Sequence, residues 1–207
     1  MINYPYLPPN RKFKFVPSSN PHMMAAEVAR QECAGDSLYP VGVVLVRDGQ
    51  VCARAGNGFN RGSSSKHICP RIVLECPSGT GYDLCSLHES IGHAEPMLMQ
   101  VANEQGIDIH GCDVYMFGHW WCCEPCWKVM IDAGVRDVYL LENAHERFSR
   151  ERVFAEILTG SRTDLRLEQE GTTYRVFVPE SIEPVFVYEA DTEELAARRF
   201  ENVRRQM

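Results

Sequence analysis

His93-Ala94-Glu95-Pro96, followed 30 residues later by Cys123-Glu124-Pro125-Cys126, is the stretch that decides how this sequence folds. Proline is best tolerated in the first turn of an α-helix, so each motif predicts a helix start. The N-termini of two helices would then bring His93, Cys123 and Cys126 together. The partial positive charge of these helix N-termini favours the thiolate form of the cysteines. One His and two Cys leave a fourth position open, which is typical of a catalytic zinc site rather than a structural one.

Glu95 completes the motif, because a carboxylate two residues after the His can take a proton from a zinc-bound water. Each half alone has a simpler interpretation: a lone His near a helix start can be a cap, and a lone C-x-x-C can be a redox pair or half of a zinc knuckle. The combination favours the catalytic interpretation. Cys122 is an alternative ligand, but Cys123 has the C-x-x-C spacing to Cys126, and we expect Cys122 to be a small buried residue.

The bulk properties place the chain among globular proteins. Its 207 residues fit one domain, or one domain with an extension, and its net charge of −7 argues against a broad nucleic-acid surface. Met1 to Val16 contain no apolar segment typical of a secretory signal, and no apolar run is long enough for a membrane span. We therefore expect a cytoplasmic protein, in which nine cysteines mixed with histidines favour metal over disulfides.

Hydrophobic periodicity and turn signals predict an α/β fold with a central mixed sheet and helices on its faces. The chain divides into an N-terminal arm (1–20), a catalytic domain (21–145) and a C-terminal extension (146–207) packed on the same domain. In the catalytic domain we expect helices over 20–33, 94–104 and 124–133 and strands over 41–46, 51–55, 114–117 and 135–141. In the extension we expect helices over 150–158 and 192–205 and strands over 173–178 and 184–188.

Residues 56–92 have little periodicity, and so long a structureless loop is usually functional or held by something. The loop contains five potential metal ligands: His67, Cys69, Cys76, Cys85 and His88. Any four of them could close a second, structural zinc site. The alternative is that the cysteines are small buried residues and the histidines are exposed, and the spacing alone does not select the ligands.

From Pro21 to Leu141 the chain resembles the zinc-dependent cytidine deaminase superfamily, and within it the deoxycytidylate (dCMP) deaminases. The likeness includes Pro40 to Val44, the segment Gly56 to Gly62, the His93 and Cys123 motifs, and Ala133-Gly134-Val135. It implies a three-layer α/β/α cytidine-deaminase-like fold, a homo-oligomer, and contact between Asn57 and the sugar or base of a substrate. Some dCMP deaminases hold a second zinc near the long loop, which adds to the interpretation given above.

The sequence departs from the family pattern in three places. Cys122 replaces the proline before C-x-x-C, Met97 replaces an Asn after the catalytic Glu, and His119-Trp120-Trp121 replaces a Ser or Thr with Pro. These changes leave the ligands and the carboxylate in place.

The resemblance implies zinc-dependent hydrolytic deamination of a small nucleotide, with dCMP giving dUMP and ammonia. Glu95 would move the protons, and Trp120, Trp121 and Phe59 are candidates to stack on the base, although each could equally be a core residue. Arg61, Lys66 and Arg71 are cationic candidates for a 5′-phosphate, or ordinary solvated charges.

Two other functions stay open. One is a deaminase of another base, a nucleoside or adenosine in RNA, although the acidic charge counts against RNA. The other is a non-catalytic, zinc-stabilised scaffold, against which the intact Glu95 argues. Neither a nucleic-acid nor a membrane partner is expected.

Overall fold

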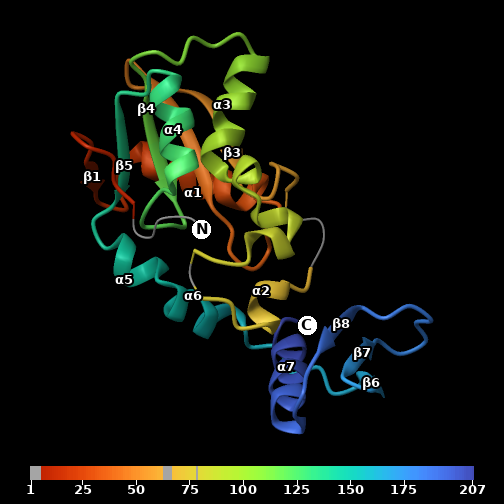
Figure 1. The fold of residues 1–207 in the computed structure, drawn as a ribbon. Helices are drawn as coiled ribbons and strands as arrows, with labels where there is room; N and C mark the ends of the chain where they lie inside the picture. The colour runs from red at the N-terminus through yellow and green to blue at the C-terminus, as the bar shows by residue number, and fades with distance from the viewer. Residues whose placement is uncertain (1–5, 63–66, 78) are drawn as a thin grey trace.

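The computed structural model describes residues 6–62, 67–77 and 79–207, and its main sheet has five strands (Figure 1). The strands are β1 (Phe13–Val16), β2 (Gly42–Arg47), β3 (Gln50–Gly56), β4 (Asp113–Phe117) and β5 (Asp137–Leu141), in the spatial order β1-β5-β4-β2-β3. β1, β5 and β4 run parallel, whereas β2 is antiparallel to both β3 and β4. The sheet is therefore mixed, as predicted.

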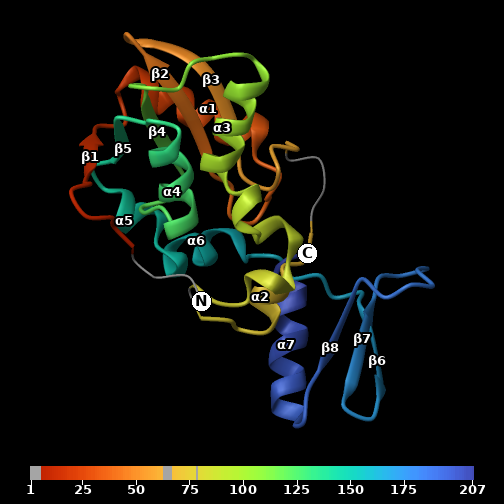
Figure 2. The ribbon, with the colours of Figure 1, turned by 45° about the horizontal axis from the view of Figure 1, so that its top comes forward.

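Helices cover both faces of this sheet. α1 (Pro21–Cys33) packs on one face, while α3 (Ala94–Glu104) and α4 (Glu124–Asp132) lie side by side on the other (Figures 1 and 2). Asn20 caps α1 as expected, because its side chain accepts hydrogen bonds from the amides of His22 and Met23. Gly42 lets β2 approach α1 closely, since a Cβ there would lie 2.0 Å from the Arg30 nitrogen. The three-layer α/β/α architecture is confirmed.

The core between the layers consists of large apolar side chains with almost no exposure. They are Leu45 of β2, Phe117 of β4, Leu140 of β5, Leu98 of α3 and Trp127 of α4. The β2–β3 turn has positive φ at Asp48 and Gly49, the backbone that a tight hairpin requires and that Asp-Gly predicts. This packed core fixes the starts of α3 and α4, which carry the two motifs.

β1 lies in the segment that the sequence suggested was only an arm. It forms the edge of the main sheet beside β5, and its Phe13 ring packs 5.2 Å from the ring of Trp127. Lys14 Nζ lies 2.6 Å from an Asp137 carboxylate oxygen. The strand has four residues, too few for a periodic pattern, and its partner lies more than 120 residues away.

The long loop after β3 contains short pieces of helix. α2 (Pro70–Val73) is followed by the 3₁₀ turns η1 (Tyr82–Leu84), η2 (Ser86–His88) and η3 (Ser90–Gly92). These pieces are too short to produce the periodicity by which helices are recognised in a sequence.

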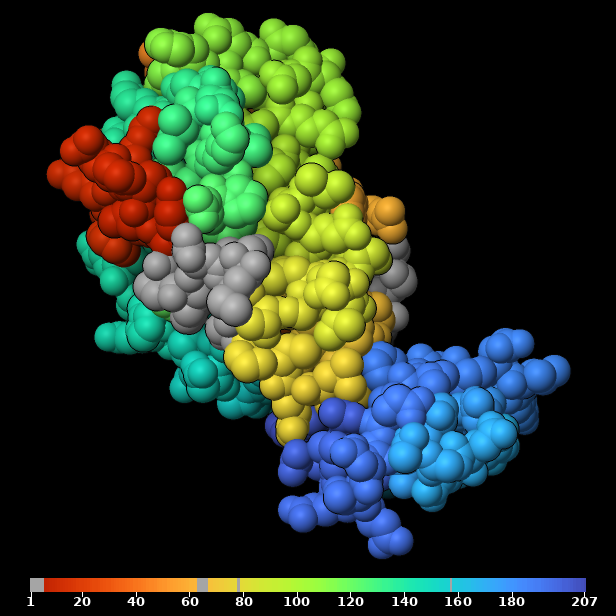
Figure 3. Space-filling model, viewed as in Figure 1, coloured from red at the N-terminus to blue at the C-terminus, as the bar shows by residue number. Residues whose placement is uncertain are grey.

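The C-terminal part adds α5 (Ala144–Phe148), α6 (Arg150–Ile157), an antiparallel sheet of β6 (Arg166–Glu170), β7 (Thr173–Phe177) and β8 (Phe186–Glu189), and α7 (Glu193–Arg205). It has its own apolar cluster, in which Val176, Tyr188 and Val203 are joined by Val73 of α2. β6 was not predicted because all five of its residues are exposed. Figure 3 shows the blue segment, which carries β6, β7, β8 and α7, projecting from the rest of the molecule beside the yellow segment that carries α2. Among the helices of the described residues, none has the length and apolar character that a membrane span needs.

Candidate functional site

His93, Cys123 and Cys126 come together at the starts of α3 and α4. His93 is the N-cap residue of α3, Cys123 is the N-cap residue of α4, and Cys126 lies one turn further on. His93 Nδ1 lies 3.3 Å from Cys126 Sγ and 3.4 Å from Cys123 Sγ, and the two sulfurs are 3.1 Å apart. Ligand atoms of a tetrahedral zinc lie roughly 3.5–3.8 Å apart, so a small outward shift would admit the ion. The three side chains could hold a metal.

The two thiols differ in how readily they lose a proton. The hydrogen bond with Cys126 lowers the pKa of Cys123 to about 5, although burial opposes this. Burial in turn raises the pKa of Cys126. His93 Nε2 lies 3.2 Å from the backbone carbonyl of His88, which can accept its proton and leave Nδ1 free to face the sulfurs.

Glu95 lies in the first turn of α3 and is 5% exposed. Burial, followed by the charge of Cys123, raises the pKa of its carboxyl group. The thiol of Cys122, itself buried as expected, contacts this carboxylate. A carboxyl group with a raised pKa, placed beside three potential metal ligands, is suited to accept and return a proton.

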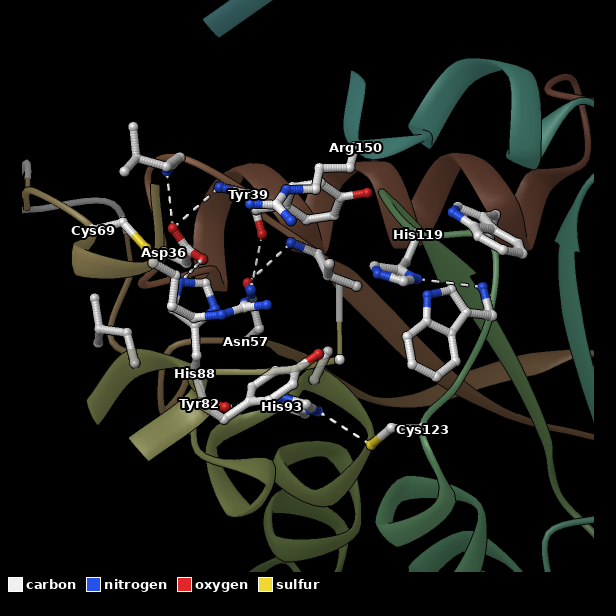
Figure 4. Close-up of a pocket in the computed structure, with 18 of the residues that line it drawn as sticks. Asp36, Tyr39, Asn57, Cys69, Tyr82, His88, His93, His119, Cys123 and Arg150 are labelled. Carbon is white, nitrogen blue, oxygen red and sulfur yellow. Dashed lines mark hydrogen bonds and ion pairs between the residues drawn. The ribbon is translucent and has the colours of Figure 1, made fainter. Parts of the chain in front are cut away.

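A cavity opens in front of these residues. His93, Glu95 and Cys123 line one part of it, and Arg150 is drawn on the other side in Figure 4. Its walls come from segments far apart in the sequence: the loop after α1, the end of β3, the long loop, the segment before α4, and α6. A small molecule in this cavity would therefore touch the motif residues and the C-terminal part together.

Two of the three predicted substrate-contacting residues line the cavity. Asn57 is 8% exposed; its Oδ1 accepts from the Val41 amide at 2.9 Å and its Nδ2 donates to the Tyr39 carbonyl at 2.9 Å. Trp120 also lines the cavity, with its ring against His145. Arg61 does not line it; its guanidinium lies over the Phe59 ring, 5.3 Å from the centroid.

The other residues that the sequence suggested as substrate contacts also include some that line the cavity and some that do not. Trp121 and Arg71 line the cavity, whereas Phe59 does not and packs against Gly92. Lys66 lies outside the described residues.

Several cavity residues had not been expected, and Tyr82, His119 and Arg150 are the ones used below. Burial lowers the pKa of His119 to about 3, so the ring is neutral, and its Nδ1 accepts from the Trp121 amide at 3.2 Å. Its other nitrogen then carries a proton and can donate into the cavity. His119 adjoins the C-x-x-C motif and could have been proposed from that position, but no sequence signal links Tyr82 or Arg150 to the motif.

A second His/Cys cluster lies in the long loop. The ligand atoms of His67, Cys69, Cys85 and His88 all lie within 4.8 Å of one another and could hold a metal ion. Both ring nitrogens of His67 are buried without a hydrogen-bond partner among the described residues, so either one is available to bind a metal. The hydrogen bond with Cys69 lowers the pKa of Cys85 to about 4. Cys76, the fifth candidate, is not part of this cluster.

Asp36 lies behind the second cluster. Its side chain is fully buried, with Oδ2 3.6 Å from His88 Nε2 and Oδ1 3.9 Å from His67 Nε2. His88 Nε2 also lies 3.3 Å from Cys69 Sγ, so Asp36 approaches the same nitrogen that faces the cluster and adds a negative charge beside the potential ligand atoms. Cys69, His88 and Asp36 also line the cavity, so the two clusters border the same space.

Comparison with protein families identifies the motif. The model of the cytidine and deoxycytidylate deaminase zinc-binding region matches residues 18–142, more than half of the chain. The chain belongs to this family. Membership makes it a deaminase with a zinc-binding domain, and the matched region contains both His/Cys clusters.

The individual relatives share little sequence identity with this chain. The deoxycytidylate deaminases of Homo sapiens and Pongo abelii are each 24% identical over 159 residues, which cover 76% of this chain and 79% of theirs. The solved dCMP deaminase of cyanophage S-TIM5 is 20% identical, with a TM-score of 0.35, over 62% of this chain and 87% of its own. A tRNA:A34 deaminase structure is 23% identical, with a TM-score of 0.29, over 56% and 72%. With such low TM-scores, the family assignment rests on the matched region.

Proposed function

We propose that this deaminase converts a pyrimidine nucleotide by hydrolysis, with dCMP as the substrate and dUMP and ammonia as the products. The observation that carries the proposal is the position of Glu95, buried beside His93, Cys123 and Cys126 at one cavity. The choice of dCMP is supported by the two deoxycytidylate deaminases that share 24% identity over most of the chain.

In this proposal His93, Cys123 and Cys126 hold the catalytic zinc. When bound, zinc supplies a water acidic enough to ionise near neutral pH. The chain's own part is to present one imidazole and two thiolates at two helix N-termini and to leave the fourth position facing the cavity.

Glu95 moves the protons. It accepts one proton from the attacking water and delivers it to N3 of the cytosine ring. It then accepts the second proton from the new hydroxyl group on C4 and delivers it to the departing amino group, which leaves as ammonia while the C4 carbonyl forms. Its burial keeps bulk water away and raises its pKa toward the working pH, so that both the acid and the base form are accessible. Asn57, Trp120 and the neutral His119 surround the base, with Asn57 held in place by its two backbone hydrogen bonds.

The second cluster has a structural part in the same proposal. His67, Cys69, Cys85 and His88 would hold a second zinc that fixes the long loop. A four-ligand His₂Cys₂ set leaves no open position, which is the pattern of a structural site. The His88 carbonyl faces His93 Nε2, so this zinc would also steady a ligand of the first.

The proposal is tested by following ammonia release from the purified, zinc-loaded protein. The panel contains dCMP, CMP, deoxycytidine, cytidine, cytosine and adenosine, with Glu95→Gln as the matched variant. We expect turnover of dCMP, and a loss of at least ~10²-fold in Glu95→Gln with its zinc content unchanged.

Each other outcome would change the proposal. Turnover confined to CMP, to cytosine or to one of the nucleosides would replace dCMP. Substantial activity of Glu95→Gln would remove Glu95 from its role. Failure on every substrate with zinc bound would favour the non-catalytic scaffold.

Assembly and location complete the proposal. We expect a homo-oligomer that acts in the cytoplasm on a free nucleotide. Light scattering of the purified chain would test the first expectation, and a monomeric mass across the working concentration range would contradict it.

A further inference from the structure

Two arginines enter the cavity from parts of the chain that are distant in sequence. Arg71 lies in α2, and Arg150 is the first residue of α6; both side chains are half-buried and line the cavity. Arg71 Nε donates to the Thr80 carbonyl at 2.8 Å, and Arg150 Nη1 donates to the Cys76 carbonyl. Backbone carbonyls therefore orient both guanidinium groups.

Neither arginine of this pair has a carboxylate partner among the residues that the structure describes. Within residues 6–62, 67–77 and 79–207, no carboxylate oxygen forms an ion pair with Arg71 or Arg150. Many other arginines of the chain do pair with a carboxylate. Asp36, the acid that shares the cavity wall, lies against His67 and His88 instead. Cys76 joins the two positions, because its carbonyl accepts from Arg150 Nη1 and its amide donates to the Arg71 carbonyl at 2.9 Å. Burial, followed by the charge of Arg71, lowers the pKa of Arg150. Two neighbouring cations facing a cavity favour an anionic ligand between them.

The side chain of Tyr82 relates one member of the pair, Arg71, to the first His/Cys cluster. The Tyr82 ring is close to both, with its centroid 5.9 Å from the His93 ring and 4.2 Å from Arg71 Cζ. A single aromatic side chain therefore reaches from the first His/Cys cluster to Arg71 within the cavity lining. In a nucleotide, one sugar ring likewise joins the base to the 5′-phosphate.

We propose that Arg71 and Arg150 form the subsite that binds the 5′-phosphate of the substrate, and that they select a nucleotide over its nucleoside. This inference rests on the deaminase function proposed above. Arg150 lies outside the region matched by the family model, so the C-terminal part contributes to substrate choice. Arg61 would have no part in this contact, because it lies over Phe59 and outside the cavity.

The test compares Arg150→Gln and Arg71→Gln with Arg152→Gln. Arg152 is a matched control because it lies on the same helix, is 65% exposed and pairs with Glu156 at 2.7 Å. We expect Arg150→Gln to lower kcat/KM for dCMP roughly 10- to 100-fold, mainly through KM, and to leave kcat/KM for deoxycytidine within about twofold. Arg150→Lys should recover part of the loss, since it restores the charge without the two-pronged geometry. Arg152→Gln should match the unaltered protein on both substrates.

A binding measurement makes the test independent of turnover. Inorganic phosphate and dUMP are titrated against each protein by calorimetry, with circular dichroism to confirm folding. We expect both probes to bind the unaltered protein and Arg152→Gln, and to bind Arg150→Gln and Arg71→Gln at least 10-fold more weakly.

The outcomes separate the subsite from the reaction. Equal losses on dCMP and deoxycytidine, or phosphate binding unchanged in both arginine variants, would overturn the subsite. Phosphate that stimulates deoxycytidine turnover without any preference for dCMP would also overturn it, because the anion would then be a free effector. Absence of all cytosine deamination, with phosphate binding lost only in the two variants, would support the anion subsite while removing the proposed reaction.

Discussion

Asn57 joins two backbone segments at the edge of the cavity. Its side chain is nearly buried and bonds both the Val41 amide and the Tyr39 carbonyl. Asn57→Ala would leave these two groups without partners, and we expect it to lower the free energy of unfolding by about 2 kcal/mol. Urea unfolding followed by fluorescence measures the change.

The matched control is Asn103→Ala, at an exposed position of α3. We expect this substitution to change the free energy of unfolding by less than ~0.5 kcal/mol. If Asn57→Ala unfolds at the same urea concentration as the unaltered protein, Asn57 does not join the two segments in solution. Contact between Asn57 and a substrate stays a prediction. One lone pair and one N–H of the amide are still available to make it.

Single residues were predictable from the sequence where a local rule fixed their position. Pro96 and Pro125 each mark a first helical turn, so His93 and Cys123 were placed at helix starts, where the structure has them. Arg150 follows no such rule, because it is an arginine at the start of an ordinary amphipathic helix. Its place in the cavity depends on how α6 packs against the rest of the molecule, which no local pattern encodes.

At the scale of elements, the loop between β3 and α3 depends on its second His/Cys cluster. His67 and Cys69 precede α2, while Cys85 precedes η2 and His88 is its last residue, so one zinc would join both ends of the segment. We expect metal analysis to give two zinc ions per chain, and one in Cys85→Ser. Because the ion binds only the folded loop, Cys85→Ser should also unfold at a lower temperature than the unaltered protein.

Cys76→Ser provides the control for this prediction. Cys76 lies in the same loop but outside the cluster, so its substitution should leave two zinc ions per chain. One zinc per chain in the unaltered protein would contradict the second site. Loss of a zinc in Cys76→Ser would mean that the ligands differ from the four that the structure brings together.

Elements were predictable in proportion to their length and burial. α1, α3 and α4 have 9 to 13 residues and a buried face, and their predicted bounds agree with the structure to within about one residue. β1 and α2 have four residues each, and β6 has no buried residue, so none of the three shows a periodic pattern. The four ligands of the second cluster could not be selected from five candidates because the loop's path determines which of them meet.

At the scale of the whole molecule, the end of the chain returns to the second cluster. Gln206, 7% exposed, accepts a hydrogen bond at 2.7 Å from the backbone amide of Cys69, and Arg198 of α7 pairs with Glu75 at 2.9 Å. α7 thereby holds α2, which carries a ligand of the second cluster at its N-cap and Arg71 on its surface. The C-terminal part thus reaches the cavity through α2 as well as through Arg150.

This connection predicts that Gln206→Ala weakens the second metal site and spares the first. The substitution removes the acceptor of a buried amide next to a ligand, and loss of a partner near a ligand typically weakens metal binding by about 10-fold or more. Competition with a chromophoric chelator should resolve two zinc ions in the unaltered protein, with only the Cys69 site weakened in the variant. Gln169→Ala, in the exposed strand β6, is the control and should leave both affinities unchanged. If Gln206→Ala releases both ions together, the C-terminus supports the whole cavity rather than α2 alone; if it changes neither, the hydrogen bond does not hold Cys69 in place.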